Sequence, residues 1–133
     1  GITFKDIKPK YLSFSEITTA IRDKTIDAGI IAAGYPIASI MELARDVPIR
    51  LLETSPEALK KLQAKYPNVQ PLAIPAGTYK GIDKPVHTYT LPQMWLCRAD
   101  LPEDLVYKIL KAVYGHPGEK NAIHPMAKRY AIQ

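Results

Sequence analysis

Capped helical segments alternate along this 133-residue chain with short apolar runs of strand length, and this alternation is the strongest constraint on its fold. Ser13 and Glu16 form a capping box, in which the serine hydroxyl can bond a free amide and the glutamate can reach back to the helix start. Residues 27–32 (DAGIIA) are an apolar run that suits a strand covered on both faces. The pattern predicts an α/β fold.

Further helices and strands follow from the same signals. Pro36 sits where a helix would begin, because proline is favoured at the first helical position. Residues 54–57 (TSPE) open another helix, and residues 100–103 (DLPE) open a third that Gly115 ends. The His124-Pro125 pair is expected to open a short helix through Tyr130. The remaining expected strands are residues 48–52, residues 69–74 and a long extended segment, residues 86–97, interrupted by Pro92.

The helix that starts at residues 100–103 has the clearest apolar stripe. Leucine, isoleucine and valine recur along it at helical spacing, so this face is expected to be buried. The stripe consists of Leu105, Val106, Ile109, Leu110 and Val113.

Composition is that of an ordinary globular domain. The chain is 47% hydrophobic and 23% charged, and its length fits a single domain over residues 1–133. No apolar run approaches the roughly 20 residues that a membrane-spanning helix needs. The chain is expected to start inside mature domain sequence, so the absence of a signal peptide at Gly1 says little about localisation.

The net charge of +5 does not point to nucleic acid. Nucleic-acid binding needs basic residues clustered on one face, whereas the lysines here are scattered over helices that also carry acidic residues. A weak attraction for small anions is expected from the charge.

The single cysteine, Cys97, excludes a disulfide and a cysteine zinc cluster within the chain. It lies in an apolar extended stretch, where a buried and inert thiol is expected. His116 and His124 do not have a metal-ligand spacing. The sequence therefore predicts no metal site and no cofactor.

No catalytic set stands out. A nucleophile needs a base beside it, and His87, His116 and His124 have no serine or cysteine motif next to them. No carboxylate pair is spaced for acid-base chemistry. The sequence therefore favours a binding protein over an enzyme.

The most informative unit is the strand, turn and helix over residues 27–44. Ala33 and Gly34 would let a ligand approach the backbone closely, and the amides of the helix that follows carry partial positive charge. Tyr35 could stack on a ligand or donate its hydroxyl. Ligands of open α/β sheets bind at the carboxyl ends of strands, where this turn is expected. The alternative is a plain tight turn, because many such connections bind nothing.

The loop at residues 76–81 (AGTYKG) is rich in glycine but lacks the spacing of a phosphate-binding loop. It is either a flexible turn or the rim of a cleft, with Tyr79 or Thr78 reaching inward.

Taken in order, six stretches of the chain resemble the solute receptors of the TAXI subfamily of TRAP transporters. The resemblance covers nearly the whole chain. The matching stretches are residues 11–16 (YLSFSE), 26–29 (IDAG), 33–36 (AGYP), 74–79 (IPAGTY), 98–108 (RADLPEDLVYK), and His124-Pro125 with Ala127.

This resemblance implies one lobe of a type II periplasmic-binding-protein fold, with a central mostly parallel sheet flanked by helices. Such receptors have two α/β lobes joined by a hinge, with the solute between them. The chain resembles the second lobe, and residues 86–97 correspond to the segment that crosses near the hinge. A lone lobe could dimerise through the surface that faced its partner.

The resemblance also implies a function. The protein would be exported to the periplasm, capture a small organic anion such as glutamate or an oxo- or dicarboxylic acid, and deliver it to the membrane subunits of a TRAP transporter. An effector-binding module and an enzyme on the same scaffold are the alternatives. The residues expected at the ligand are Ala33, Gly34, Tyr35, Pro36, Tyr79 and Thr88.

Overall fold

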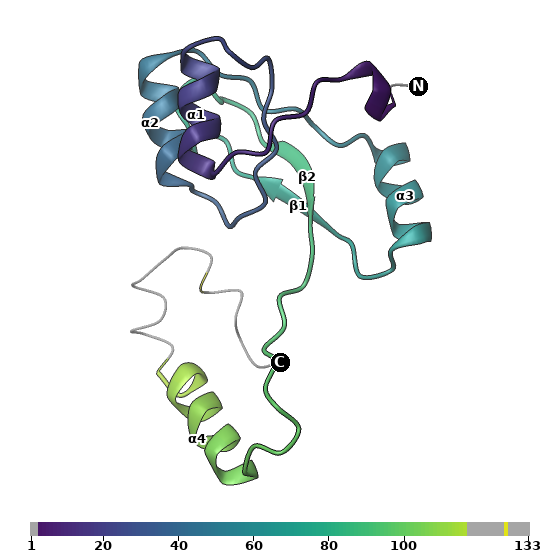
Figure 1. The fold of residues 1–133 in the computed structure, drawn as a ribbon, viewed down its shortest axis with the longest axis vertical. Coiled ribbons are helices and arrows are strands. Elements are labelled where there is room, and N and C mark those ends of the chain that lie inside the picture. The colour runs from purple at the N-terminus through teal and green to yellow at the C-terminus, as the bar shows by residue number, and fades with distance from the viewer. Residues whose placement is uncertain (1–2, 117–126, 128–133) are drawn as a thin grey trace.

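The structure, a computed structural model, describes residues 3–116 and Ala127. It contains four α-helices and a two-stranded sheet, so the predicted α/β class is confirmed (Figure 1). The elements are a 3-10 helix Phe4–Asp6, α1 (Phe14–Arg22), α2 (Ala38–Asp46), α3 (Pro56–Lys65), β1 (Gln70–Ile74), β2 (Val86–Thr90) and α4 (Glu103–Tyr114).

The helix starts follow the capping signals in the sequence. Ser13 Oγ accepts from the Glu16 amide at 3.4 Å, and the Glu16 carboxylate accepts from the Ser13 amide at 2.7 Å, which confirms the capping box of α1. These bonds from the Ser13 hydroxyl and amide hold the pKa of Glu16 below its ordinary value. At α3, Ser55 Oγ accepts from the Ala58 amide at 3.2 Å.

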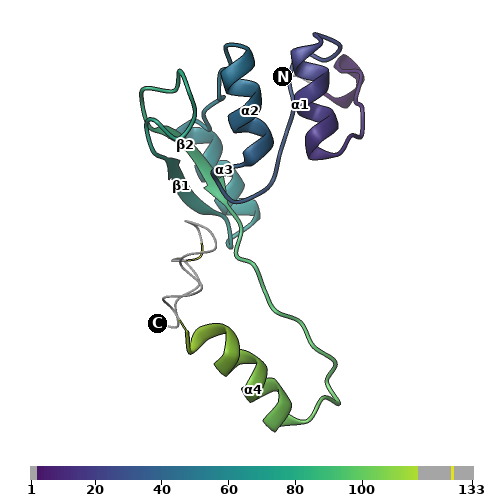
Figure 2. The same ribbon diagram turned by 90° about the vertical axis from the view of Figure 1, so that its left-hand side faces the viewer.

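The two strands form an antiparallel hairpin in which Leu72 lies opposite Thr88 and Ile74 opposite Val86. The connecting loop closes through a hydrogen bond from the Gly77 amide to the Ile82 carbonyl at 2.8 Å. Gly77 has a φ of 74°, which a residue with a Cβ rarely adopts. In Figure 2 the hairpin, α2 and α1 follow one another across the upper part of the molecule.

The expected mostly parallel sheet is not formed by the described residues, whose sheet has two antiparallel strands. Residues 48–52 form no ladder with β2, and just after them the Thr54 amide donates to the His87 carbonyl at 2.9 Å. Residues 27–32 cross α1 instead of joining a ladder, and Ile30 is exposed. An apolar run predicts extended backbone, but a strand also needs a neighbour for its hydrogen bonds.

The long extended segment after β2 also differs from the prediction. The ladder stops at Thr90, since Pro92 has no amide to donate and residues 91–100 are all exposed. Cys97 lies on this exposed stretch, so the expectation of a buried thiol is wrong. The helix expected from His124-Pro125 through Tyr130 lies outside the described residues.

The core lies between α2 and the hairpin. Ala44, Tyr79, Ile82 and Val86 form its buried cluster. The buried stripe predicted for α4 is wrong: Leu105, Ile109 and Leu110 are exposed and Val106 and Val113 are half-buried, because α4 lies away from the hairpin and from α1–α3 (Figure 1). No helix within residues 3–116 is long and apolar enough to cross a membrane.

A close approach between Gly29 and α1 holds residues 27–32 in place. A Cβ added at Gly29 would collide with Cγ2 of the buried Ile17 and touch Ile21. Replacing Gly29 with alanine should therefore lower the free energy of unfolding by about 1–3 kcal/mol, as overpacking does. Urea denaturation followed by circular dichroism measures this change.

Ile17→Ala provides the control. Alone it should also destabilise the protein, because it leaves a cavity. The double variant Gly29→Ala, Ile17→Ala should lose less unfolding free energy than the sum of the losses in the two single variants. The reason is that the new methyl group occupies the space that Ile17 left. Additive losses would contradict the predicted contact.

Candidate functional site

The start of α2 presents backbone amides without a side-chain cap. Ile37 is the N-cap residue, with extended backbone at φ −100° and ψ 123°, and its carbonyl accepts from the amides of Ile40 and Met41. No hydrogen bond is found for the amides of Ala38 and Ser39 within the described residues. These donors and the helix dipole give the start of α2 a positive potential.

Tyr79 takes the place of the missing cap. Its phenolic oxygen accepts from the Ile37 amide at 3.1 Å, although 42 residues separate the two in sequence. The side chain is only 3% exposed and belongs to the buried cluster. Burial raises the pKa of Tyr79, and the bond from Ile37 opposes part of that rise. The structure thus gives Tyr79 a structural position behind the turn.

Tyr35 makes a second link between the turn and the hairpin. Its hydroxyl donates to the Ala73 carbonyl of β1 at 3.4 Å, a long bond on a half-buried side chain. The Tyr35–Pro36 peptide bond is cis. Tyr35 and Tyr79 therefore hold the two residues on either side of Pro36 against the hairpin.

The other residues predicted in the turn lie as follows. Ala33 and Gly34 are exposed, so their backbone is open to a ligand, and Pro36 is half-buried. The helix does not begin at Pro36 as predicted but at Ala38, because Ile37 still has extended backbone. The helix start and the small residues of the turn remain neighbours in the chain.

Thr78 and Thr88 have different surroundings. The Thr78 hydroxyl donates to the Pro75 carbonyl at 2.7 Å, which closes its own loop and does not reach outward. Thr88 lies on β2 opposite Leu72, and no hydrogen bond joins it to the turn within the described residues. The structure therefore brings together the turn and Tyr79 and gives Thr88 no polar link to them.

Ser39 is the residue that the sequence analysis missed. It is the second residue of α2, and its Oγ is buried without a hydrogen-bond partner in the described residues. A buried hydroxyl without a partner costs free energy, so a ligand or a water that reached this oxygen would remove that cost. The signal in the sequence is a serine in the first turn of α2, where a side-chain hydroxyl can hydrogen-bond to a ligand at the N-terminal end of the helix.

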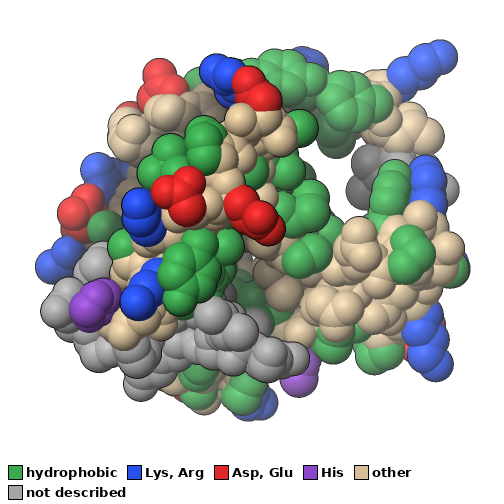
Figure 3. All heavy atoms as spheres, turned by 90° about the horizontal axis from the view of Figure 1, so that it is seen from below, with side chains coloured by type: hydrophobic (Ala, Val, Ile, Leu, Met, Phe, Trp, Pro, Cys, Tyr) green, Lys and Arg blue, Asp and Glu red, His purple; other side chains and the backbone are tan. Residues whose placement is uncertain are grey.

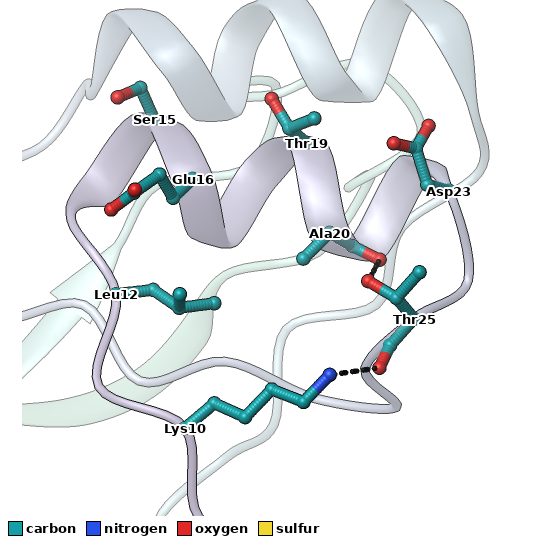
Figure 4. Close-up of a pocket in the computed structure, with 8 residues that line it drawn as sticks. All are labelled: Lys10, Leu12, Ser15, Glu16, Thr19, Ala20, Asp23 and Thr25. Atoms are coloured by element: carbon teal, nitrogen blue, oxygen red, sulfur yellow. Dashed lines mark hydrogen bonds between the residues drawn. The ribbon is translucent and has the colours of Figure 1, made fainter.

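Two hollows lie elsewhere on the surface. One lies against α1, where Lys10, Glu16 and Asp23 share a wall with Leu12 and Ala20 (Figure 4). In it Lys10 Nζ donates to the Thr25 carbonyl at 3.1 Å.

The other hollow lies between residues 50–53 and residues 82–86. Neither hollow is lined by any of the six predicted ligand residues. Across residues 3–116, no three histidine, cysteine or acidic side chains gather as metal ligands.

The set at the start of α2 can bind an anion through neutral groups. Its donors are the Ala38 and Ser39 amides and the Ser39 hydroxyl, and the exposed Ala33 and Gly34 precede them in the chain. An isolated carboxylate accepts several such bonds, and a helix start favours it electrostatically.

The chain matches a protein-family model over its full length. A model described as the NMT1-like family covers residues 1–133, the whole of this sequence.

The Tyr79 cap predicts a measurable loss when its oxygen is removed. Tyr79→Phe keeps the ring in the core but leaves the Ile37 amide unpaired, so unfolding should require about 1–3 kcal/mol less free energy. Urea denaturation measures the difference. Tyr11→Phe is the matched control, because Tyr11 is largely exposed and its loss of a hydroxyl should change nothing. Equal effects of the two substitutions would contradict the cap.

The raised pKa of Tyr79 predicts a loss of stability at alkaline pH. The pKa of Tyr79 in the folded state lies above its unfolded value near 10.0. The protonated side chain therefore contributes fully to the free energy of unfolding below that pH, and this contribution is lost as the pH rises above it. The wild-type protein should therefore lose stability more steeply than Tyr79→Phe as the pH rises above about 10. Parallel pH profiles of the two melting temperatures would rule out this role of Tyr79.

Proposed function

The chain belongs to the NMT1-like family, which is a periplasmic-binding-protein-like family with a general solute-binding function, and from this premise we propose that it is the extracytoplasmic receptor of a TRAP-type transporter. Its solute is a small organic anion, such as glutamate or a related oxo- or dicarboxylate. The TRAP assignment and the class of solute rest on the TAXI resemblance of the sequence and on the chemistry at the start of α2.

The single observation that supports an anionic solute is the group of unused donors at α2. The amides of Ala38 and Ser39 and the Ser39 hydroxyl lie at the positive end of the helix. The turn and the first turn of α2, residues 33–39, contain no charged side chain, so nothing there repels or replaces an anion. A guest carboxylate would supply the acceptors that these donors lack.

Neighbouring groups suit a small guest. Ala33 and Gly34 are exposed and have little or no side chain, so a ligand can reach the backbone. The half-buried Tyr35 ring stands beside them as an apolar wall, fixed by its bond to Ala73. The net charge of +5 attracts anions from a distance and raises their rate of encounter.

In this role the protein works in the periplasm, binds its solute without a cofactor and passes it to the membrane subunits of the transporter. An effector-binding module would use the same donors but would require a regulated partner. An enzyme on the same scaffold would require a reactive side chain near the bound solute. Cys97 lies on the exposed segment after β2, and native labelling with a thiol reagent at several pH values tests whether it reacts as an activated thiolate.

Calorimetric titration tests the proposed ligand. The purified protein should bind at least one of glutamate, 2-oxoglutarate and succinate. Ser39→Ala should weaken that binding roughly tenfold to a hundredfold, since a hydrogen bond to a charged group contributes about 1.5–3 kcal/mol. Glutamine should bind more weakly than glutamate if the second carboxylate is recognised.

Ser15→Ala is the matched control, because Ser15 is an exposed serine near the start of α1. It should leave the affinity unchanged. An absence of binding heat with every organic anion, at low and at moderate salt, would contradict the proposal. Equal losses in Ser39→Ala and Ser15→Ala would place the ligand away from α2.

A further inference from the structure

The hollow beside α1 carries charges that the proposed solute site does not use. It lies between the exposed face of α1 and the segments that carry Lys10 and Thr25 (Figure 4). Its volume of about 340 Å³ is in the range of sites that hold small molecules. No residue that lines it belongs to the donor set at the start of α2, so a ligand here would be bound independently of the solute.

Lys10 supplies the positive charge of the hollow. Its Nζ donates to the Thr25 carbonyl at 3.1 Å, and the Thr25 hydroxyl donates to the Ala20 carbonyl at 3.3 Å. These two bonds hold the ammonium near the C-terminal end of α1. An ammonium has three donors and the Thr25 carbonyl engages one of them, so the others can bond to an anionic group of a guest.

Two carboxylates supply negative charge from α1. Asp23 follows the last residue of the helix, where the helix dipole also favours a cation. Glu16 accepts from the Ser13 amide and hydroxyl through Oε2, and its Oε1 makes no hydrogen bond within the described residues. None of the ion pairs among residues 3–116 includes Glu16 or Asp23. Both carboxylates can therefore accept from a cationic guest.

Apolar side chains line the hollow between the two carboxylates. Seven residues are close to two helical turns, so Glu16 and Asp23 lie on the same face of α1, roughly 10 Å apart along its axis. In Figure 4 they lie toward opposite ends of the hollow, with Ala20 between them and Leu12 alongside. A guest that lies along α1 therefore meets a carboxylate at each end and apolar side chains in the middle.

These groups match the charges of a free basic amino acid. Its α-carboxylate would accept from Lys10, and its neighbouring α-ammonium would donate to Asp23 at the same end of the hollow. Its apolar stem, four carbons long in lysine, would lie along Leu12 and Ala20. The cation at the end of the stem would then donate to Glu16.

Other charged guests fit the hollow less well. A diamine has no anionic group for Lys10, and a dicarboxylate would face two carboxylates of its own charge. A lysine residue within a peptide lacks both α charges. Figure 3 shows the basic and acidic side chains of the described residues interspersed on the face seen from below, so no patch of a single charge on that face competes for such a guest.

We propose that the hollow beside α1 binds a free basic α-amino acid, such as lysine or arginine, through three charges. Lys10 binds the carboxylate, Asp23 binds the α-ammonium and Glu16 binds the side-chain cation. All three side chains are exposed, so the affinity depends on salt and on the three charges acting together.

Nuclear magnetic resonance of the ¹⁵N-labelled chain tests the proposal, with lysine and arginine added up to about 10 mM at low salt. The amide signals of Thr19, Asp23 and Thr25 should shift and saturate with both amino acids. Norleucine lacks the terminal cation of lysine, and cadaverine lacks its carboxylate. Each should bind about threefold to tenfold more weakly than lysine. Lysine with an acetylated α-nitrogen and an amidated carboxyl, which represents a residue of a peptide, should bind more weakly still.

Two substitutions test the carboxylates. Asp23→Asn should weaken the binding of lysine about threefold to tenfold, because it removes one charge and keeps the size of the side chain. Glu16→Gln should have a similar effect, since glutamine preserves the capping box. Asp27→Asn is the matched control, because Asp27 is an exposed aspartate that does not line the hollow, and it should leave the affinity unchanged.

The absence of saturable shifts at α1 with both amino acids would overturn the proposal. It would also be overturned if norleucine, cadaverine or the blocked lysine bound as tightly as lysine, or if Asp23→Asn and Asp27→Asn caused equal losses. Saturable shifts at Ala38 and Ser39 alone would assign the amino acid to the start of α2 and would overturn it too. Lysine binding at α1 does not depend on glutamate binding at α2, so the two proposals succeed or fail separately.

Discussion

The hydrogen bond between the Tyr79 hydroxyl and the Ile37 amide is the interaction on which the rest of this structure depends. It joins the loop of the hairpin to the start of α2, and the ring that carries it lies in the buried cluster with Ala44 and Val86. A single side chain thus fills the core and caps a helix that has no capping side chain of its own. Because the cap occupies only the Ile37 amide, the amides of the next two residues stay available to a guest.

The turn of the candidate site could be located from the sequence, but its construction could not. Small residues before a proline and an apolar helix predict an open helix start, and Ala33 and Gly34 are indeed exposed. The roles of Tyr79 and Ser39 depend on contacts across the fold, which local patterns do not specify. Tyr79 was predicted at a cleft and lies in the core, while Ser39 was not predicted and has a buried hydroxyl for which the described residues offer no hydrogen-bond partner.

The same distinction explains which elements of the fold were predicted. The starts of α1 and α3 are encoded by neighbouring residues, since Ser13 and Ser55 bond amides three positions away. Strands need partners that are distant in sequence, so an apolar run such as residues 27–32 indicates extended backbone without fixing its neighbour. The apolar residues of α4 recur at helical spacing, but periodicity does not show whether another surface covers them, and Leu105, Ile109 and Leu110 are exposed.

The central claim is that an organic anion binds to the first amides of α2. Nuclear magnetic resonance of the ¹⁵N-labelled protein, titrated with glutamate and with 2-oxoglutarate, observes those amides directly. The account predicts that the Ala38 and Ser39 amide signals shift the most and saturate with one of these anions. Saturable shifts confined to other parts of the chain, with Ala38 and Ser39 unchanged, would contradict it.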